Sequence, residues 1–415
     1  MKKSVAVLTL VAGMLWICGT SAAAKPLKVF ILAGQSNMQG HAKVATFDSM
    51  AMVPETAPIL NEMRASDGTL RVCDKVWISA VGVAEEERHG KLTVGYGAKH
   101  SDLKIGPEFT FGIYMQKALD EPILIIKTAW GGKSLHTDFR PPSMGVYNLN
   151  DGQKEQCRKR GQDIGEKQAE ADEASGQYYR LMVEHVEKVL GDIKRVYPAY
   201  DARQGYELAG LVWFQGWNDM VDSGVYPERD KPGGYDDYTE CLAAFIRDVR
   251  KDLDAPNMPF VIGVMGVGGP LDRYENKRNQ TVHGNFRKAM AAPAARREFK
   301  GNVRTVFTAN CWDVELGELD ARWQKVKNKS RALDKNKSLS RAERSEALEK
   351  YKAEQFTTKE LELRENAISN AAYHYLGSAR IMARIGKAFA EAMGLPDQYD
   401  AENPPFRLRE VERKE

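Results

Sequence analysis

Ser36 is the residue best placed to act as a nucleophile. It lies in the segment GQSNM (34–38), directly after the apolar run 29–33. A sharp turn from a strand into a helix exposes a serine hydroxyl, and the nearby backbone N–H groups are free to bind an oxyanion. The segment therefore indicates acyl transfer through a serine. The alternative is a helix cap, a common role for a serine after a glycine turn.

Two further segments carry groups that can bind developing negative charge. Gly131 and Gly132 follow the apolar run 123–126, and without side chains their N–H groups can approach a ligand closely. Asn218 follows the apolar run 208–214, and its amide can donate to an oxyanion. Losing one such donor costs roughly 10²–10³ in rate, so we expect several in one site. The alternatives are a tight turn at the glycines and a plain turn residue at Asn218.

Of the seven histidines, His374 is the best candidate for the general base. It lies in a loop before the last predicted helix, where a side chain can reach across the edge of a sheet. His136 follows the glycine pair and is the alternative base, or else a substrate contact. His41 is close to Ser36 along the chain, and its role is left open.

Four segments in this order resemble the sialate O-acetylesterase-like branch of the SGNH hydrolases, which includes acetyl xylan esterases. The signature lies in FILAGQSNMQG (30–40), the Gly-Gly turn in KTAWGGKSL (127–135) and the Gln-Gly block in WFQGWND (213–219). The fourth segment is His374 with Gly377 after it. The resemblance extends from residue 27 to residue 393 and leaves out a charged insertion.

This resemblance implies a role for each residue. Ser36 is the nucleophile and His374 is the base that takes its proton. The oxyanion is held by the N–H groups of Ser36 and Gly132 and by Asn218. The remaining expected contacts are substrate binding by Gln35, Gln215 and His136, and either sugar stacking or core packing by Trp130, Trp217 and Trp312.

The residue that should orient His374 departs from the family pattern. Many SGNH enzymes have an aspartate three residues before the histidine, but Ala371 stands there. Loss of such a carboxylate can cost about 10⁴ in turnover. We therefore predict a relocated acid, Asp219 first, with Asp313 or the nearby Glu315 as rivals. Helix capping by the aspartates, a Ser-His dyad and a noncatalytic protein of the same fold are the alternatives.

The elements that must position these residues alternate between strands and helices. Amphipathic stretches predict helices at 178–190, 238–253 and 379–393. The pattern predicts a three-layer α/β/α sandwich with a parallel five-stranded sheet, the flavodoxin-like arrangement of SGNH hydrolases, and ligands bind beyond the carboxyl ends of its strands. The predicted strands are 29–33, 123–126, 208–214, 260–264 and 303–308.

Two charged segments, 151–176 and 321–365, do not fit this alternation. The second has a capping-box pattern at Ser340 and Glu343, which predicts an exposed helical insertion rather than a binding arm. We expect one esterase domain over residues 25–400 and a polar tail over 401–415.

The first residues predict export. Two lysines precede the apolar run 5–18 and the small residues 21–24, the order of a secretory signal cleaved near Ala24. The expected location is the periplasm or the exterior, with no membrane span after cleavage. Such a compartment permits disulfides among the cysteines left after cleavage, although the sequence does not pair them: Cys73, Cys157, Cys241 and Cys311.

Composition fits an ordinary globular protein and limits its partners. The 415 residues are 43% hydrophobic, and 60 basic against 57 acidic residues give a net charge of +3. Such a weak field favours neither nucleic acid nor an anionic membrane. The histidine and cysteine spacings indicate no metal, and ester hydrolysis needs no organic cofactor. We predict a secreted serine esterase that removes O-acetyl groups from saccharides, with a noncatalytic carbohydrate-binding protein as the alternative.

Overall fold

A seven-stranded sheet forms the centre of the protein, whose computed structural model describes residues 25–394. The predicted signal segment, residues 1–24, and the predicted polar tail, residues 401–415, both lie outside these residues. The strand order is β4-β3-β6-β1-β7-β8-β9, and only the β3–β4 pair is antiparallel. The strands are β1 (Leu27–Gly34), β3 (Val76–Val81), β4 (Arg88–Lys91), β6 (Ile123–Ala129), β7 (Tyr206–Phe214), β8 (Phe260–Val264) and β9 (Val303–Phe307).

All five predicted strands are present, and two further strands extend the sheet to seven. The missed strands, β3 and β4, form one side of the sheet. β3 contains the buried Ser79, whose hydroxyl bonds to His185 and Glu87, so its apolar run is interrupted. β4 is a polar edge strand without an apolar run, and a polar edge discourages pairing with other chains.

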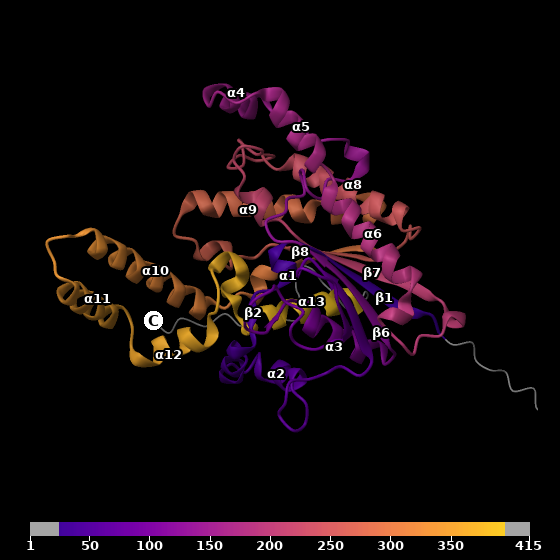
Figure 1. Cartoon of the computed structure of the whole chain (residues 1–415), viewed down its shortest axis with the longest axis horizontal. Helices are drawn as coiled ribbons and strands as arrows, with labels where there is room; N and C mark the ends of the chain where they lie inside the picture. The colour runs from indigo at the N-terminus through magenta and orange to yellow at the C-terminus, as the bar shows by residue number, and fades with distance from the viewer. Residues whose placement is uncertain (1–24, 395–415) are drawn as a thin grey trace, which may run out of the picture.

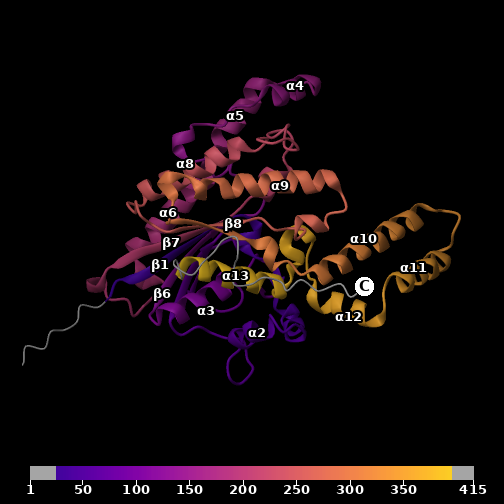
Figure 2. The ribbon, with the colours of Figure 1, turned by 180° about the vertical axis from the view of Figure 1, so that it is seen from behind.

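Helices cover both faces of the sheet, which makes the predicted three-layer sandwich (Figure 1, Figure 2). One face carries α3 (Glu108–Leu119) and α13 (Ala379–Gly394), which pack against each other. The other carries α6 (Gln177–Gly191), α8 (Asp236–Asp252) and α9 (Lys277–Ala291). The three predicted helices correspond to α6, α8 and α13 to within about two residues.

The two charged segments are helical and lie outside the three layers (Figure 1). Ser340 caps the helix Arg341–Gln355 (α11) in the predicted capping box with Glu343. The first segment forms α4 (Asp151–Lys159) and α5 (Ile164–Ala174), and the second belongs to α10 (Val314–Lys335), α11 (Arg341–Gln355) and α12 (Thr358–Ala367).

Short elements complete the fold around the sheet edge. They are α1 (Ser36–Gln39), α2 (Ala57–Met63), α7 (Trp217–Val221), the paired strands β2 (Ala42–Lys43) and β5 (Lys104–Ile105), and the 3₁₀ turn η10 (Ala372–Gly377). Among the described helices, none has the length and apolar character needed to span a bilayer. The four cysteines are buried and unpaired.

Candidate active site

The strands β6, β1 and β7 are neighbours in the sheet, and their carboxyl ends lie level with one another, which brings the predicted segments together. β1 lies between β6 and β7, and Gly34 is in register with Ala129 on one side and Phe214 on the other. A Cβ on Gly34 would lie only 2.2 Å from the Phe214 carbonyl oxygen, so this approach requires glycine. The half-buried Ser36 opens α1 directly beyond this row, and its hydroxyl bonds to no described residue.

The glycine pair lies against the serine. A Cβ built on Gly131 would be 3.9 Å from the Ser36 Cβ. Gly132 has φ of +77°, and no atom of a non-neighbouring residue lies within 4 Å of the place a Cβ would take. The turn therefore leaves open space next to Ser36 and requires a backbone conformation that glycine adopts readily.

The Gln-Gly block is the other wall of this site. The Asn218 N–H donates to Gln35 Oε1 at 3.5 Å, which joins the start of α7 to the residue before Ser36. Gln35 and Gln215 are both buried. Gln215 Nε2 donates to Asp219 Oδ2 (2.5 Å) and to the Lys133 carbonyl (3.1 Å). The two glutamines thus belong to the buried framework of the site, and Gln35 Nε2 has no hydrogen-bond partner in the described structure.

Neither predicted aspartate orients His374. Asp219 is fully buried and accepts bonds from Leu135 N (2.8 Å), His136 N (3.0 Å), Gln215 and the Tyr226 hydroxyl (3.2 Å). These bonds hold the segment after the glycine pair.

Asp313 and Glu315 are used elsewhere as well. Asp313 caps α10 and pairs with Arg380 at 3.3 Å, and Glu315 lies 3.8 Å from the same guanidinium. For Asp313 the helix-capping alternative is correct.

Asn370 takes the position behind His374 instead. His374 Nδ1 lies 3.0 Å from Asn370 Oδ1, which also accepts the Ala371 N–H at 2.8 Å. A backbone N–H can only donate, so this atom of the amide is the oxygen and His374 Nδ1–H is a second donor to it. His374 Nε2 is then left with a lone pair and can act as a base.

The turn that carries His374 has an unusual backbone. Tyr375 and Leu376 have φ of +52° and +61°, a region that side chains rarely adopt. The buried Tyr375 anchors the turn, because its hydroxyl accepts the Gly266 N–H at 2.8 Å and bonds to Thr308 Oγ1 at 2.6 Å. Such strain persists where the surrounding structure fixes it and often marks a functional site.

His41, five residues after Ser36, lies against His374. Its ring stacks on that of His374, with centroids 3.8 Å apart and planes at 4°. Burial lowers the pKa of His374 to about 4, with a smaller effect from Lys104. Burial and the neighbouring His374 lower the pKa of His41 to about 3. Both rings are therefore neutral at pH 7, as a general base must be.

No direct hydrogen bond joins Ser36 to His374 in the described structure. The turn η10, which carries His374, packs against α1, which begins at Ser36. The expected carboxylate is likewise replaced by the Asn370 amide. Catalytic hydrogen bonds in structures without substrate are often long and tighten when substrate binds.

The remaining predicted residues lie around this centre. His136 bonds to Thr137 Oγ1 at 2.6 Å, has Asp222 at 3.7 Å and faces a separate cavity. The ring of Trp217 lies 5.7 Å from that of Tyr373, beside His374. Trp130 packs against Tyr178 and Phe139, and Trp312 is buried in the core.

Sequence reasoning missed Asn370 and left His41 without a role. Asn370 is four residues before His374, whereas the family pattern has its aspartate three residues before the histidine. An asparagine is also a weaker indication of a catalytic partner than an aspartate, because it carries no charge. His41 and His374 are 333 residues apart, and no local pattern connects them.

The fold and the site define an α/β/α sandwich with a serine, glycine N–H groups, an asparagine and a histidine at one sheet edge. The chain belongs to the carbohydrate esterase family described as sialic acid-specific acetylesterases, whose family model matches residues 26–296. Asn370 and His374 lie beyond the matched range.

Two solved structures show what the chain is similar to. A carbohydrate acetylesterase from Xanthomonas citri aligns with a TM-score of 0.37 and 14% identity, over 69% of this chain and 51% of that chain. A protein from Arabidopsis thaliana aligns with a TM-score of 0.34 and 17% identity, over 68% and 86%. The chain thus spans about half the length of the Xanthomonas protein. No curated protein matches the chain.

Proposed function

We propose that the protein is an exported serine O-acetylesterase that removes acetyl groups from saccharides. The observation that carries the proposal is the meeting of Ser36, Gly131 and Asn218 at the ends of β1, β6 and β7, with a neutral histidine alongside. Membership of a carbohydrate esterase family supports the same class of reaction. Export remains a prediction from residues 1–24.

Ser36 Oγ attacks the acetyl carbonyl carbon, and its proton passes to His374 Nε2. The carbonyl oxygen becomes an oxyanion that accepts hydrogen bonds from Ser36 N–H, Gly132 N–H and the Asn218 amide. The bond from the acyl carbon to the sugar oxygen then breaks, and His374 returns the proton to that oxygen. A water molecule attacks the acetyl-serine in the same way and releases acetate and free Ser36.

Asn370 influences these reaction steps through His374. By accepting Nδ1–H, its carbonyl keeps the lone pair on Nε2, where the serine proton must arrive. The low pKa of His374 supplies a neutral base at any pH above about 4. The same low pKa makes the imidazolium a strong acid toward the departing sugar oxygen.

The test is acetate release from O-acetylated xylan, O-acetylated sialic acid and p-nitrophenyl acetate. We expect the purified protein to act on at least one of them, and Ser36→Ala to lower kcat on the order of 10⁶-fold, as loss of a serine nucleophile does. Ser143→Ala is the matched control, because this exposed serine makes no side-chain bond in the described structure.

The missing bond between Ser36 and His374 favours one rival, a carbohydrate-binding protein without catalysis. That rival predicts saccharide binding with no acetate release from any of the three substrates. Equal turnover by the native protein and Ser36→Ala would instead remove Ser36 as the nucleophile.

A further inference from the structure

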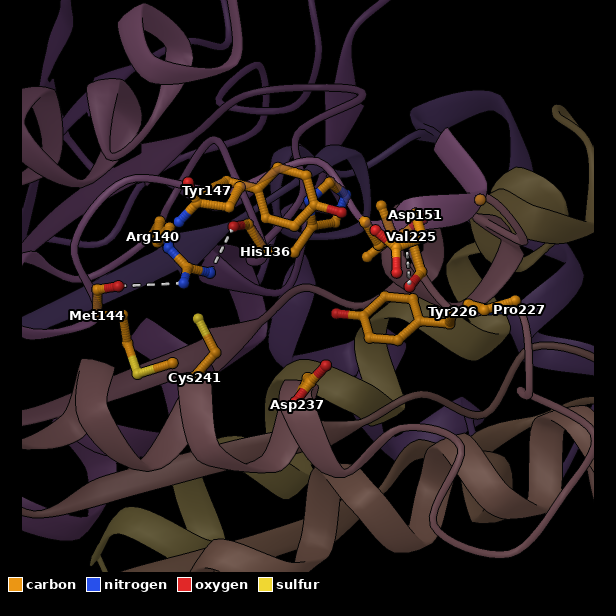
Figure 3. A pocket seen from close by; sticks show the side chains of 13 residues that line it. His136, Arg140, Met144, Tyr147, Asp151, Val225, Tyr226, Pro227, Asp237 and Cys241 are labelled. Atoms are coloured by element: carbon orange, nitrogen blue, oxygen red, sulfur yellow. Dashed lines mark hydrogen bonds between the residues drawn. The ribbon is translucent and has the colours of Figure 1, made fainter. Parts of the chain in front are cut away.

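A cavity of about 530 Å³ has a lining that includes neither Ser36 nor His374. Figure 3 shows the side chains that line it. Its walls come from the segment after the glycine pair, the start of α4, the loop after α7 and the start of α8. This volume is within the range of small-molecule pockets, roughly 300–1,000 Å³. The esterase chemistry proposed above assigns it no role.

The cavity and the candidate active site share one structural segment. His136 lines the cavity and is five residues from Gly131, so their Cα atoms are at most roughly 18 Å apart. Asp219, which directly follows Asn218 and bonds to Gln215, also accepts the N–H of His136 and the hydroxyl of Tyr226, two residues that line the cavity. An oligosaccharide of a few units is long enough to reach both places.

The lining combines an aromatic surface with polar groups. The half-buried ring of Tyr147 stands over His136, with centroids 5.1 Å apart, and its hydroxyl is held by Gln153 (Figure 3). Its position is therefore fixed before a ligand arrives. An aromatic face with a few polar groups around it suits a sugar, which has apolar C–H faces and a rim of hydroxyl groups.

The charges argue against an acidic sugar. Asp151 and Asp237 line the cavity with exposed side chains, and Asp222 is beside His136. The cation Arg140 is engaged, because its guanidinium donates to the carbonyls of His136, Gly145 and Met144. A carboxylated sugar would meet the two lining carboxylates, with Asp222 behind His136, and no free guanidinium fork to bind its own carboxylate.

We propose that this cavity binds a neutral glycosyl unit of an oligosaccharide whose acetylated unit reaches Ser36. The inference rests on the proposed esterase function, and it departs from the sialic acid specificity in the family's description. The substrate class is therefore a neutral O-acetylated oligosaccharide rather than a sialylated one.

The first experiment compares KM values of the native protein and Tyr147→Ala. For acetylated neutral oligosaccharides we expect KM to rise roughly two- to tenfold, as loss of an aromatic contact implies, with kcat little changed. For p-nitrophenyl acetate, which is too small to reach the cavity, KM should not move. Tyr206→Ala is the matched control, an exposed tyrosine at the opposite end of β7. Equal KM values for native protein and Tyr147→Ala on every oligosaccharide would overturn the proposal.

The second experiment separates this proposal from the esterase itself. Titration calorimetry with unacetylated xylo-, manno-, cello- and chito-hexaose and with sialyllactose needs no turnover. The proposal for the cavity is supported if a neutral hexaose binds the native protein and binds Tyr147→Ala more weakly, provided that the two proteins have the same melting temperature. This holds even if the protein releases no acetate. The assignment of a neutral sugar would be overturned if sialyllactose bound more tightly than every neutral hexaose and if Tyr147→Ala weakened that binding. Absence of binding by every neutral hexaose at millimolar concentration would overturn the site.

Discussion

At the scale of single residues, the arrangement around His374 is the least expected feature. An amide oxygen, that of Asn370, takes the place of the expected carboxylate beside His374, the proposed base, and it is fixed in orientation by the Ala371 N–H. In a serine triad, exchanging aspartate for asparagine is harmful because the amide can present its NH₂ group and select the wrong tautomer. Here the backbone donor prevents that rotation, so the amide selects the productive tautomer.

Asn370 substitutions test this positioning role. We expect Asn370→Ala to lower kcat by up to about 10⁴-fold with KM little changed, because the ring loses its orientation but the substrate contacts remain. Asn370→Asp should keep activity and raise the pKa of His374, because a carboxylate stabilises the imidazolium. The check is a pair of steady-state pH profiles. An unchanged kcat in Asn370→Ala would show that the amide does not position the base.

The pH dependence of the native enzyme follows from the same histidine. With a pKa of about 4, His374 stays neutral far below the usual 6.5. We therefore expect kcat/KM for p-nitrophenyl acetate to be level from pH 7 to about pH 5 and to fall only near pH 4. Short assays with a fluorescence check of folding separate this from unfolding. A midpoint near 6.5 would mean that His374 is not the base, or is not buried as described.

At the scale of elements, a buried lysine at the end of β6 holds α1 in place. Lys127 is fully buried, and its Nζ donates to the carbonyls of Gln39 and Tyr96 (both 2.8 Å) and to Glu108 Oε2 (2.6 Å). It thus joins β6 to the end of the helix that Ser36 begins, and to α3. Burial lowers the pKa of Lys127, and the carboxylate of Glu108 opposes that shift.

Removing one partner of this pair should be costly. We expect Lys127→Met to lower the free energy of unfolding by about 3–5 kcal/mol, since Glu108 is left as a buried charge without its partner. The double variant Lys127→Met with Glu108→Leu should recover part of that loss. Urea denaturation of the two single variants and the double variant gives the coupling energy. Additive effects would mean that the pair acts only through packing.

At the scale of the whole molecule, four histidines, His185 buried and His41, His283 and His374 half-buried, make the protein sensitive to acid. Burial lowers the pKa of His41 to about 3 and those of His185, His283 and His374 to about 4, each from 6.5. Between pH 6.5 and about pH 4 these histidines bind protons in the unfolded chain but not in the folded one. Their contribution to the free energy of unfolding is therefore fully present above pH 6.5 and is lost as the pH falls toward 4.

Urea midpoints at pH 7, 6 and 5 test this. We expect a steady decrease, with an uptake of up to about four protons on unfolding near pH 5 if these groups dominate. His185→Gln removes one of the four at a site remote from Ser36 and should lower the proton uptake by about one. A midpoint independent of pH over this range would contradict the assignment of these histidines as neutral and buried.

The fold was largely readable from the sequence where burial leaves a continuous apolar run. Four of the five predicted strands contain a dense apolar run because the centre of the sheet is buried on both faces, and the edge strand β9 keeps the apolar residues Val303, Val306 and Phe307. β3 and β4 were not predicted, because Ser79 interrupts the apolar run of β3 and because β4 is a polar edge strand. Domain extent, export and the roles of the site residues stay predictions, because the geometry alone does not test them.

The sequence by itself determined the layered fold and the order of the segments that meet at its edge, because strand burial and turn chemistry are local properties. Only the tertiary structure decided what surrounds the base. The stacking of His41 on His374 joins residues 333 positions apart, and the use of Asn370 depends on a turn with left-handed Tyr375 and Leu376. Asp219 does not contact His374 but accepts the N–H groups of Leu135 and His136. This contact is set by the packing of α7 rather than by any spacing along the chain.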